Sequence, residues 1–512
     1  MTVHTSWRQT IPELLVFFEK HFDQRIRAHH VELGFSIYII DFSQWKLRLS
    51  EATPVIVVPA ADLADSSATT LGQSLTDVIR VRKFEQRNPV VLVEGSGHEL
   101  RRYFRTSFVS VMVLDAEDQA AILVSRRPSG ELLNRLSQQV SLSVLSPYET
   151  SKPVTGSRFF GREAEVRRII SSDANFAIMG IRRIGKTSLL KEIGERYTIH
   201  AQESGDKLAE ERVIFLDCSS IKSAEHFMQE IVRKLHPQEL TRINHRHFPL
   251  HFPDFLNRMA KRYQGPLVFL LDEFDELLVA IANDRDILEA LRSSSNTDSA
   301  RYIVAGFRRL LQEVSNLDSP FFNFVKPLRL KEFTSNEAAA MIIEPMRNLG
   351  VHLERANEIV ARIVQETASQ PNLIQFYCSI LIEQLDRMDV RTLTLEMLFS
   401  VHESEEFRAF LLNTFMDNTS HLEKAIVFAL LVKYYPETTA FDLEAIEDAL
   451  AEQQVKGFFM DLDQACNNLE LAGAFVRKGK LYYFATPIFA EVLMESYNAK
   501  YLLRKVIEEG VW

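Results

Sequence analysis

Short apolar runs alternate with amphipathic segments along most of this 512-residue chain. Runs rich in valine and isoleucine between turn residues are typical of buried strands, and apolar positions three or four residues apart are typical of helices. Within residues 1–150 this pattern predicts strands at 35–40, 54–59, 89–93 and 110–114, and helices at 12–28, 71–84, 98–105 and 130–143. Because strands and helices alternate, we expect a small α/β domain with a parallel sheet.

The same alternation continues on a larger scale over residues 158–330, with strands expected at 176–179, 213–217, 267–271 and 302–306. Residues 334–398 have an all-helical pattern, and its first helix begins at Thr334-Ser335-Asn336-Glu337, a typical N-cap followed by a first-turn carboxylate. Residues 420–500 predict three helices and then a two-stranded hairpin around Lys478-Gly479.

The segment 145–157 contains two prolines, a glycine and several hydroxyl residues, so it is the best candidate for a linker. We therefore expect an α/β fold that has several parts. They are an N-terminal α/β sensor or effector domain (1–148), a linker (149–157), a parallel-sheet P-loop NTPase core (158–332), a helical lid (333–400) and a winged-helix domain (401–512).

Composition agrees with a folded protein of several domains: 46% of residues are hydrophobic and 25% are charged, with a formal net charge of −10. That charge argues against coating nucleic acid or an anionic membrane through bulk electrostatics. The three cysteines lie far apart, which predicts a reducing compartment. Since the first ten residues are polar and no stretch approaches the ~18 apolar residues of a membrane span, we expect a soluble, cytoplasmic protein without a membrane partner.

A phosphate-binding loop is the clearest chemical motif. A short apolar strand precedes the pattern G-x-x-x-x-G-K-[ST], and a helical pattern follows it. Glycines let backbone N–H groups face phosphates, the lysine reaches the β- and γ-phosphates, and the threonine hydroxyl binds Mg²⁺. The nucleotide-binding residues expected here are Gly180, Ile181, Arg182, Arg183, Ile184, Gly185, Lys186, Thr187 and Ser188.

Carboxylates follow the apolar run 267–271, at the end of a strand expected to neighbour the loop. Asp272 is expected to hold Mg²⁺, and Glu273 to act as the general base on the attacking water. Asp275 and Glu276 fit a solvated helix start equally well. Loop and carboxylates together predict binding of ATP with Mg²⁺, with hydrolysis.

Three motifs resemble those of AAA+ and STAND ATPases, including archaeal-type and origin-recognition ATPases. They are FFGREAE at 159–165, GIRRIGKTSLL at 180–190 and LLDEFDEL at 270–277, and the resemblance covers roughly residues 154–500. It implies that Gly161, Arg162 and Glu163 lie near the adenine and the nucleotide hinge, although an N-capped helix start would also explain this box.

The resemblance implies further roles downstream. The strand ending at Gly306 is similar to the strand that carries a polar sensor residue, but this chain has Gly306-Phe307-Arg308-Arg309 there. Arg308 or Arg309 is a candidate arginine finger toward a neighbouring subunit, or simply a solvated helix start. Pro371 matches a Gly-x-Pro box in which Ser369 replaces the glycine. No second-sensor arginine is visible, which favours the STAND type.

The helices and hairpin of residues 420–500 resemble a winged helix whose third helix would span 459–471. This helix carries acidic residues, and Asn467 and Asn468 are its only candidate base readers. Residues 401–512 contain 18 acidic and 10 basic side chains, so a phosphate-rich ligand would be repelled. A protein-contact or autoinhibitory role is therefore favoured over DNA binding.

Other polar groups have no motif around them. Asp41 and Glu94 follow expected strands of the N-terminal domain, where parallel sheets often bind ligands, but no nuclease or hydrolase pattern accompanies them. His245, His247 and His251 lack an accompanying carboxylate or cysteine, and a polar surface loop is the better interpretation.

These observations leave three functional hypotheses open. The first is an ATP-dependent switch that couples ATP or ADP binding to self-association or to a protein partner, in regulation or antiviral defence, with slow hydrolysis. The second is a DNA-binding AAA+ ATPase of the origin-recognition or transposition type. The third is an enzymatic effector in residues 1–148 that the ATPase gates.

Overall fold

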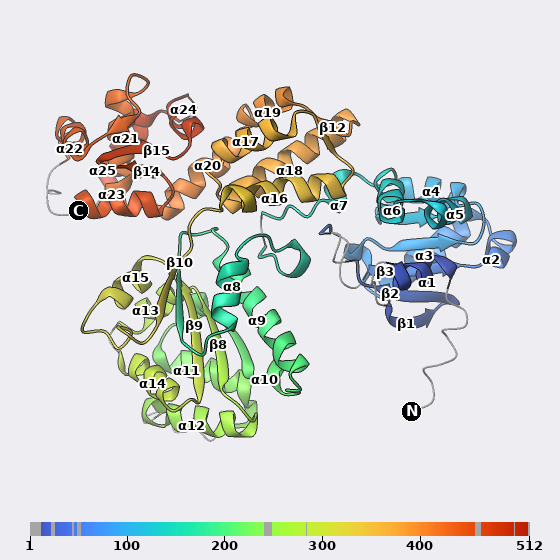
Figure 1. Cartoon of the computed structure of the whole chain (residues 1–512), viewed down its shortest axis with the longest axis horizontal. Helices are drawn as coiled ribbons and strands as arrows, with labels where there is room; N and C mark the ends of the chain where they lie inside the picture. The colour runs from blue at the N-terminus through green and yellow to red at the C-terminus, as the bar shows by residue number, and fades with distance from the viewer. Residues whose placement is uncertain are drawn as a thin grey trace. The chain divides into compact units, whose positions relative to one another are not determined.

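The computed structural model describes residues 12–21, 26–42, 46–48, 53–150, 152–239, 248–282, 284–455, 462–495 and 497–509 (Figure 1). The chain divides into two compact units. Unit 1 contains Met1–Thr150, Ala339–Ile363 and Gln375–Val401, and unit 2 contains Ser151–Ala338, Val364–Ile374 and His402–Trp512.

Unit 1 is built on a five-stranded sheet in the order β1-β2-β3-β4-β5. These strands are β1 (Ile26–Glu32), β2 (Phe35–Ile40), β3 (Thr53–Val58), β4 (Val90–Val93) and β5 (Met112–Leu114). β3, β4 and β5 are parallel, as expected, but β1 pairs with β2 and β2 with β3 in antiparallel fashion. The sheet is therefore mixed, and the expectation of an all-parallel sheet was wrong for its first half.

The strand β1 also corrects the helix expected over residues 12–28. Helix α1 (Glu13–His21) is shorter, and a hairpin begins at Ile26. Leu33 and Gly34 both have positive φ, 49° and 89°, and they join Glu32 to its partner Phe35. Such two-residue turns match the twist of antiparallel strands, so cross-strand pairing decides the conformation of this segment.

Helices cover the sheet of unit 1, and apolar side chains of α3 and α4 pack on alternate residues of β3, β4 and β5. The helices expected at 71–84 and 98–105 are confirmed, whereas the helix expected at 130–143 is divided into two. The helices of this part are α2 (Ala60–Asp65), α3 (Ala68–Val81), α4 (His98–Arg105), α5 (Ala116–Val124), α6 (Pro128–Ser137) and α7 (Leu142–Leu145).

The expected helical run after residue 334 is present, with a short parallel strand pair inside it. The N-cap expected at its start is formed, because Thr334 Oγ1 accepts from Glu337 N–H at 3.3 Å and the Glu337 carboxylate accepts from Thr334 N–H at 2.9 Å. The elements are α16 (Ser335–Asn348), β11 (His352–Leu353), α17 (Ala356–Glu366), α18 (Pro371–Met388), β12 (Thr392–Leu393) and α19 (Leu395–His402).

Unit 2 contains a second sheet, whose five strands are all parallel in the order β10-β6-β9-β8-β7. Four of them confirm the strands expected from sequence, and β10 was not expected. They are β6 (Phe176–Met179), β7 (Val213–Asp217), β8 (Leu267–Asp272), β9 (Ala300–Gly306) and β10 (Lys326–Arg329).

Both faces of this parallel sheet are buried. Phe269 and Leu271 contribute to one apolar cluster, and Val268 and Leu270 contribute to another, since side chains alternate along a strand. This explains why the sequence of β8 is an unbroken apolar run up to Asp272. The surrounding helices are α8 (Glu163–Ile170), α9 (Lys186–Glu203), α10 (Ala209–Arg212), α11 (Ala224–Leu235), α12 (Phe248–Arg262), α13 (Phe274–Ala280), α14 (Asp286–Asn296) and α15 (Arg308–Ser315) (Figure 1).

The C-terminal part of unit 2 has the helices and hairpin expected from sequence, and the short strand β13 adds a third strand to the hairpin. The predicted third helix is observed from Leu462 to Leu471; its expected first residues lie outside the described part of the chain. The elements are α20 (Glu405–Asn418), α21 (His421–Tyr434), β13 (Ala440–Phe441), α22 (Leu443–Glu452), α23 (Leu462–Leu471), β14 (Phe475–Lys478), β15 (Leu481–Phe484), α24 (Pro487–Glu495) and α25 (Ala499–Glu509).

Two further sequence features can be placed. Cys218, Cys378 and Cys466 are all buried and free. In the described part of the chain, no helix combines the length and the apolar composition that a bilayer span requires.

Candidate functional site

The strand order of the unit 2 sheet brings the predicted motifs to one edge. The phosphate-binding loop follows β6, and the carboxylates follow β8. The sequence led us to expect that these two strands would be neighbours. In the structure β9 lies between them, so they are not hydrogen-bonded to each other. The carboxyl ends of β6, β9 and β8 therefore all face the crevice where parallel sheets bind ligands.

The loop from Gly180 to Gly185 has the shape that its residue types imply. Gly185 adopts φ 100°, which only glycine reaches without strain, and α9 begins at the next residue. A Cβ on Gly180 would lie 2.9 Å from the Ile184 side chain, so this position also needs glycine. Ile181 and Ile184 are buried in the core and hold the loop to the sheet.

Lys186 lies within this loop with its ammonium group turned inward. Its Nζ donates to the carbonyl oxygens of Gly180 and Ile181, both at 2.9 Å, and the side chain is 6% exposed. Burial lowers the pKa of this ammonium, while the charges of Glu273 and Asp272 oppose the shift. A buried cation enclosed by backbone is suited to bind an anion that replaces those carbonyl contacts.

The next two residues connect the loop to its surroundings. Thr187 Oγ1 donates to Asp272 Oδ2 at 2.5 Å, although the two residues are 85 positions apart. Two oxygen ligands thus converge beside the loop, and hydroxyl, carboxylate and phosphate oxygens are the ligands that Mg²⁺ prefers. The residues present therefore fit Mg²⁺. Ser188 has a different contact, because its Oγ accepts from Val154 N–H at 3.1 Å.

Glu273 follows Asp272 in a left-handed backbone conformation, with φ 48°. Its N–H donates to Asp272 Oδ1 at 3.0 Å, which fixes the turn between β8 and α13. Burial raises the pKa of the Glu273 carboxyl, and the neighbouring Asp272 charge adds to the shift, while Lys186 opposes it. A carboxylate with a raised pKa beside a cation is a reasonable general base.

The Gly-Arg-Glu box lies at the junction between α8 and the start of α16. Arg162 is 5% exposed with φ 62°; its N–H donates to Glu337 Oε1 at 2.8 Å, and its guanidinium lies over the Phe333 ring at 4.9 Å. Burial lowers the pKa of Arg162, although nearby carboxylates partly compensate. Gly161 has φ 67°, which allows the chain to approach the same Glu337 carboxylate.

Glu163 and Pro371 complete this set of predicted residues. Glu163 pairs with Arg196 of α9 through two hydrogen bonds of 2.6 and 2.7 Å, so it ties α8 to the helix that follows the loop. Pro371 is buried at the first position of α18. Ser369 adopts φ 56° just before it, which explains why the resembling box has glycine at this position.

The tip of the phosphate-binding loop contacts the C-terminal helices of the same unit. Arg182 N–H donates to Asn418 Oδ1 at 2.7 Å. The Arg183 guanidinium lies 5.1 Å from the Phe410 ring centre and 3.8 Å from an Asp417 oxygen. Both arginines, which we expected among the nucleotide-binding residues, thus contact residues of their own chain.

Arg308 lies on the other side of the same contact. Its guanidinium forms a two-pronged ion pair with Glu423, one bond measuring 2.6 Å, and also donates to Asn418 O at 2.8 Å. Glu423 is 1% exposed, and it also accepts from Asn468 Nδ2 at 3.1 Å. An arginine occupied in this way is not free to reach a neighbouring subunit, so a finger role would require this pair to open.

Sequence reasoning missed Asn418 and Glu423 as members of the site. Ser420 and Glu423 form a capping box at the start of α21, a pattern that can be read from sequence but that indicates only a helix N-terminus. Reasoning from sequence also left Asp275 unresolved. Its two oxygens accept from the N–H groups of Phe307, Arg309 and Leu310, at 2.5, 2.7 and 3.3 Å.

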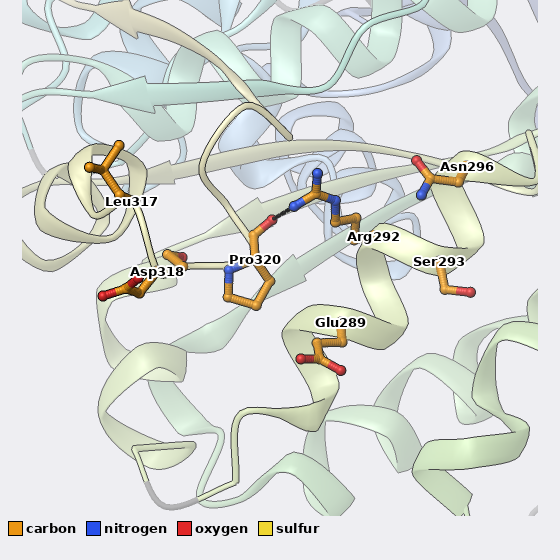
Figure 2. A pocket seen from close by; sticks show the side chains of 8 residues that line it. Glu289, Arg292, Ser293, Asn296, Leu317, Asp318 and Pro320 are labelled. Carbon is orange, nitrogen blue, oxygen red and sulfur yellow. Dashed lines mark hydrogen bonds between the residues drawn. The ribbon is translucent and has the colours of Figure 1, made fainter.

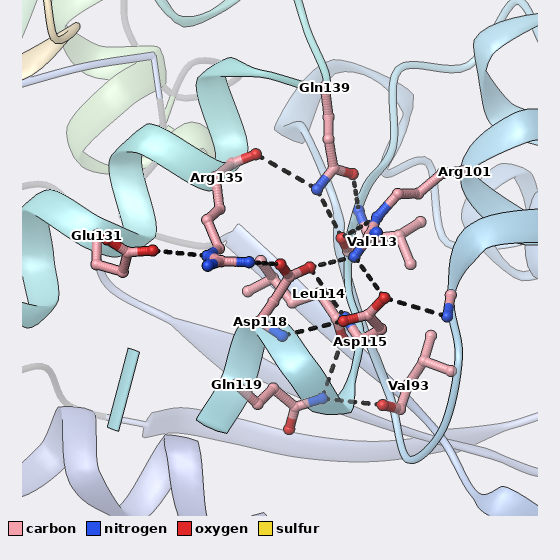
Figure 3. A network of polar contacts seen from close by, with 11 residues as sticks. Val93, Arg101, Val113, Leu114, Asp115, Asp118, Gln119, Glu131, Arg135 and Gln139 are labelled. Atoms are coloured by element: carbon pink, nitrogen blue, oxygen red, sulfur yellow. Dashed lines mark hydrogen bonds and ion pairs between the residues drawn. The ribbon is translucent and has the colours of Figure 1, made fainter. Parts of the chain in front are cut away.

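The corresponding sheet edge in unit 1 is occupied by a closed ion network (Figure 3). Asp118 pairs with both Arg101 and Arg135, and Asp115 lies 2.9 Å from Arg101. Glu94, one of the candidate ligand groups, accepts from Ala60 N–H at 3.4 Å at the start of α2. The two aspartates and the two arginines of this network therefore neutralise one another.

Two hollows lined by described residues carry no comparable set of groups. One of about 510 Å³ lies between α14 and residues 317–320, where Arg292 donates to Pro320 O at 3.1 Å (Figure 2). Another of about 260 Å³ lies beside β5 in unit 1. Of the three histidines considered, His251 is exposed and the other two lie outside the described residues. Among the described residues, no group of three metal-binding side chains is present.

Comparison with known proteins agrees with the geometry of unit 2. Residues 167–313, which include the phosphate-binding loop and both carboxylates, match the family described as "AAA domain". No curated protein matches the chain significantly.

Several solved structures are similar over a larger part of the chain. A Walker-type ATPase of Pyrococcus abyssi is 17% identical, with a TM-score of 0.47 over 68% of this chain and 99% of its own. The ORC2 protein of Aeropyrum pernix, in ADPNP and ADP complexes, is 15% identical, with a TM-score of 0.49 over 70% of this chain and 98% of its own. The RuvB branch migration motor of Thermotoga maritima is 14% identical, with a TM-score of 0.36 over 65% of this chain and 95% of its own.

These overall similarities are too low to support a functional inference, and the local evidence is stronger. The parallel sheet, the loop after β6 and the carboxylates after β8 are those of a nucleotide-binding core, and the family match covers the same residues. Residues 167–313 therefore form a P-loop core that matches the AAA domain family.

Proposed function

We propose that this chain is an ATP-binding and ATP-hydrolysing switch, in which the nucleotide state controls the C-terminal part of unit 2. One observation carries the proposal. The backbone of the phosphate-binding loop is hydrogen-bonded to the C-terminal helices, through Arg182 N–H and Asn418 Oδ1. A loop that must adjust to phosphate is thus joined directly to another module.

Chemical roles in the ATPase core follow from the contacts around the loop. Lys186 would exchange its two carbonyl contacts for phosphate oxygens, and Thr187 and Asp272 would hold Mg²⁺. The metal would neutralise phosphate charge. Glu273, whose carboxyl has a raised pKa, would accept a proton from the attacking water. Arg308 would stabilise phosphate charge once released from Glu423.

A switch requires two states with different contacts, and the Arg308–Glu423 pair supplies one of them. Glu423 is almost fully buried, so loss of the arginine would leave a carboxylate without its cation. The pair is therefore stable only while the C-terminal helices stay against the core. A phosphate group that attracts Arg308 would compete with Glu423 and weaken that contact.

The remaining elements fit the same scheme. Gly161, Arg162, Glu163 and Pro371 would form the adenine side and the hinge of the nucleotide site. Residues 333–400 would act as a helical lid, and residues 401–512 as a winged-helix domain that binds protein rather than DNA. We infer that self-association or a protein partner reads the released state, and that residues 1–148 sense or act on that signal.

Two contacts argue against base reading by α23. Asn468 donates to Glu423, and Asn467 donates to Asp463 at 3.4 Å, so both candidate readers are already engaged. The net negative charge of residues 401–512 points the same way. These contacts and this charge therefore argue against the alternative, a DNA-binding ATPase of the origin-recognition type.

The proposal is tested by measuring ATP affinity and molecular mass on the full chain. Lys186→Ala should reduce ATP affinity by at least ~100-fold, because the phosphate charge loses its main cation. Lys261→Ala, which changes an exposed lysine of α12, is the matched control. Wild-type ATP affinity in Lys186→Ala would rule out the assigned site.

Mass measurement with and without ATP, repeated with DNA at low salt, distinguishes the switch hypothesis from the DNA-binding hypothesis. A change in mass that depends on ATP and on Lys186 supports the switch. A DNA complex that forms only with ATP, and weakens steeply with salt, would instead support the origin-recognition alternative.

A further inference from the structure

The turn between β9 and α15 is held in place by a residue of another helix, α13. Phe307 precedes α15, and no side chain of its own segment caps that helix. Instead, Asp275 from the start of α13 accepts from three N–H groups of residues 307–310, at 2.5, 2.7 and 3.3 Å. The first turn of the helix that carries Arg308 is thus anchored to the segment that carries Asp272 and Glu273.

A second observation shows how closely the two segments fit. A Cβ built on Gly306 would lie 2.1 Å from Asp275 Oδ2, and such a distance is not tolerated. The Asp275 carboxylate therefore occupies the space that a side chain at position 306 would need. This explains why the chain has glycine at the end of β9, where the strands that it resembles carry a polar sensor residue.

A third observation places the pair beside the phosphate-binding loop. Gly180 N–H donates to Gly306 O at 3.2 Å, so the end of β9 contacts the first residue of the loop. Asp275 is also one of the three carboxylates whose charges act on Lys186. Asp275 itself contacts backbone groups of the turn. The expected phosphate and metal ligands are other residues, namely Lys186, Thr187 and Asp272.

We infer that Asp275 is a positioning residue for hydrolysis. It holds residues 306–310 at a fixed distance from the loop, so that Arg308 can exchange Glu423 for a phosphate oxygen by side-chain rotation alone. The inference rests on the proposed ATPase activity and adds to it a residue that touches neither nucleotide nor metal. It assigns to Asp275 the positioning of this turn, in the space that a side chain at position 306 would need.

The inference predicts a separation of binding from catalysis. Asp275→Ala should keep ATP affinity within about threefold, because the loop and its lysine are untouched, and should lower kcat by roughly 10- to 100-fold through misplacement of the turn. Gly306→Ala should give a similar loss, since the new methyl group displaces the carboxylate from the opposite side.

Two further variants keep the experiment decisive. Asp275→Asn retains one acceptor oxygen and should recover part of the kcat lost in Asp275→Ala. Glu276→Ala removes the exposed carboxylate of the adjacent residue and should leave kcat and ATP affinity unchanged. Retained ATP affinity shows in each case that the ATPase core is folded.

The measurements are ATP binding and single-turnover hydrolysis on the full chain. Absence of hydrolysis in the wild-type chain would overturn the proposed function itself. Wild-type hydrolysis by Asp275→Ala, in a chain whose wild type hydrolyses ATP, would overturn only the role of Asp275. Equal losses of affinity and of kcat would show a merely structural role and would also overturn it.

Discussion

The two sheets of this chain place similar residues at the carboxyl ends of parallel strands, yet only one edge has the features of a site. In unit 1, Asp115 and Asp118 are closed in by Arg101 and Arg135. In unit 2, Asp272 and Glu273 lie beside one buried lysine and a phosphate-binding loop. The difference is that the carboxylates of unit 1 form ion pairs with arginines, whereas Asp272 accepts hydrogen bonds from Thr187 and from Glu273 N–H.

The pKa directions express the same contrast. Burial alone would raise the pKa of Asp115, but hydrogen bonds from Asp118 and Gly97 and the charge of Arg101 outweigh it and leave the pKa lowered. For Glu273, burial and the charge of Asp272 together raise the pKa. A carboxyl whose pKa is lowered stays charged and serves a structural role here, whereas one whose pKa is raised accepts a proton more readily.

The largest expected effect is on catalysis at the unit 2 edge. Glu273→Gln should lower kcat by about 10²- to 10⁴-fold while ATP affinity stays close to that of the wild type, because only the proton acceptor is removed. Single-turnover hydrolysis and equilibrium binding measure the two quantities. Glu276→Gln is the matched control, and an unchanged kcat in Glu273→Gln would exclude the base role.

The unit 1 edge should respond in stability and not in nucleotide chemistry. Asp118→Ala leaves Arg101 and Arg135 without their shared carboxylate, which should reduce the free energy of unfolding by about 2–3 kcal/mol, given that both arginines are partly exposed. Denaturant unfolding measures this loss. Glu117→Ala, at an exposed neighbour, should change little, and ATP affinity should stay the same in both.

The contact between core and C-terminal helices should respond more weakly. Glu423→Gln keeps the capping box of α21, which accepts either residue, but removes the charge that holds Arg308. We expect nucleotide exchange about tenfold faster, corresponding to about 1.4 kcal/mol, and assembly at lower ATP concentration. Stopped-flow release of a fluorescent nucleotide tests this, with the exposed Glu444→Gln as control; an unchanged release rate would remove Glu423 from the switch.

The smallest expected effect is a shift in the pH dependence of kcat. Because the pKa of Glu273 is raised, its basic form is lost as pH falls through that raised value, so kcat should fall at a pH above the ordinary glutamate value of 4.5. The profile of Glu273→Gln should lack this acidic limb. An acidic limb at the ordinary value would indicate that Glu273 is more solvated than its position here implies.

The sequence by itself determined which chemical groups the P-loop core contains. Its glycine pattern, the lysine and the apolar run before Asp272 are local features, and each has a physical meaning that does not depend on distant residues. The strands β6, β8 and β9 were found for the same reason, since a strand buried on both faces reads as a continuous apolar run, and β7 is partly buried.

Tertiary structure decided which polar groups would meet. Glu423 and Asn418 come from helices more than 100 residues beyond Arg308, and Asp275 reaches a turn more than 30 residues away. The strand β1 became a strand only through pairing with β2. Contacts between distant segments depend on how sheets and helices pack, so the residue types show which chemistry is available, and the fold decides which groups remain free to use it.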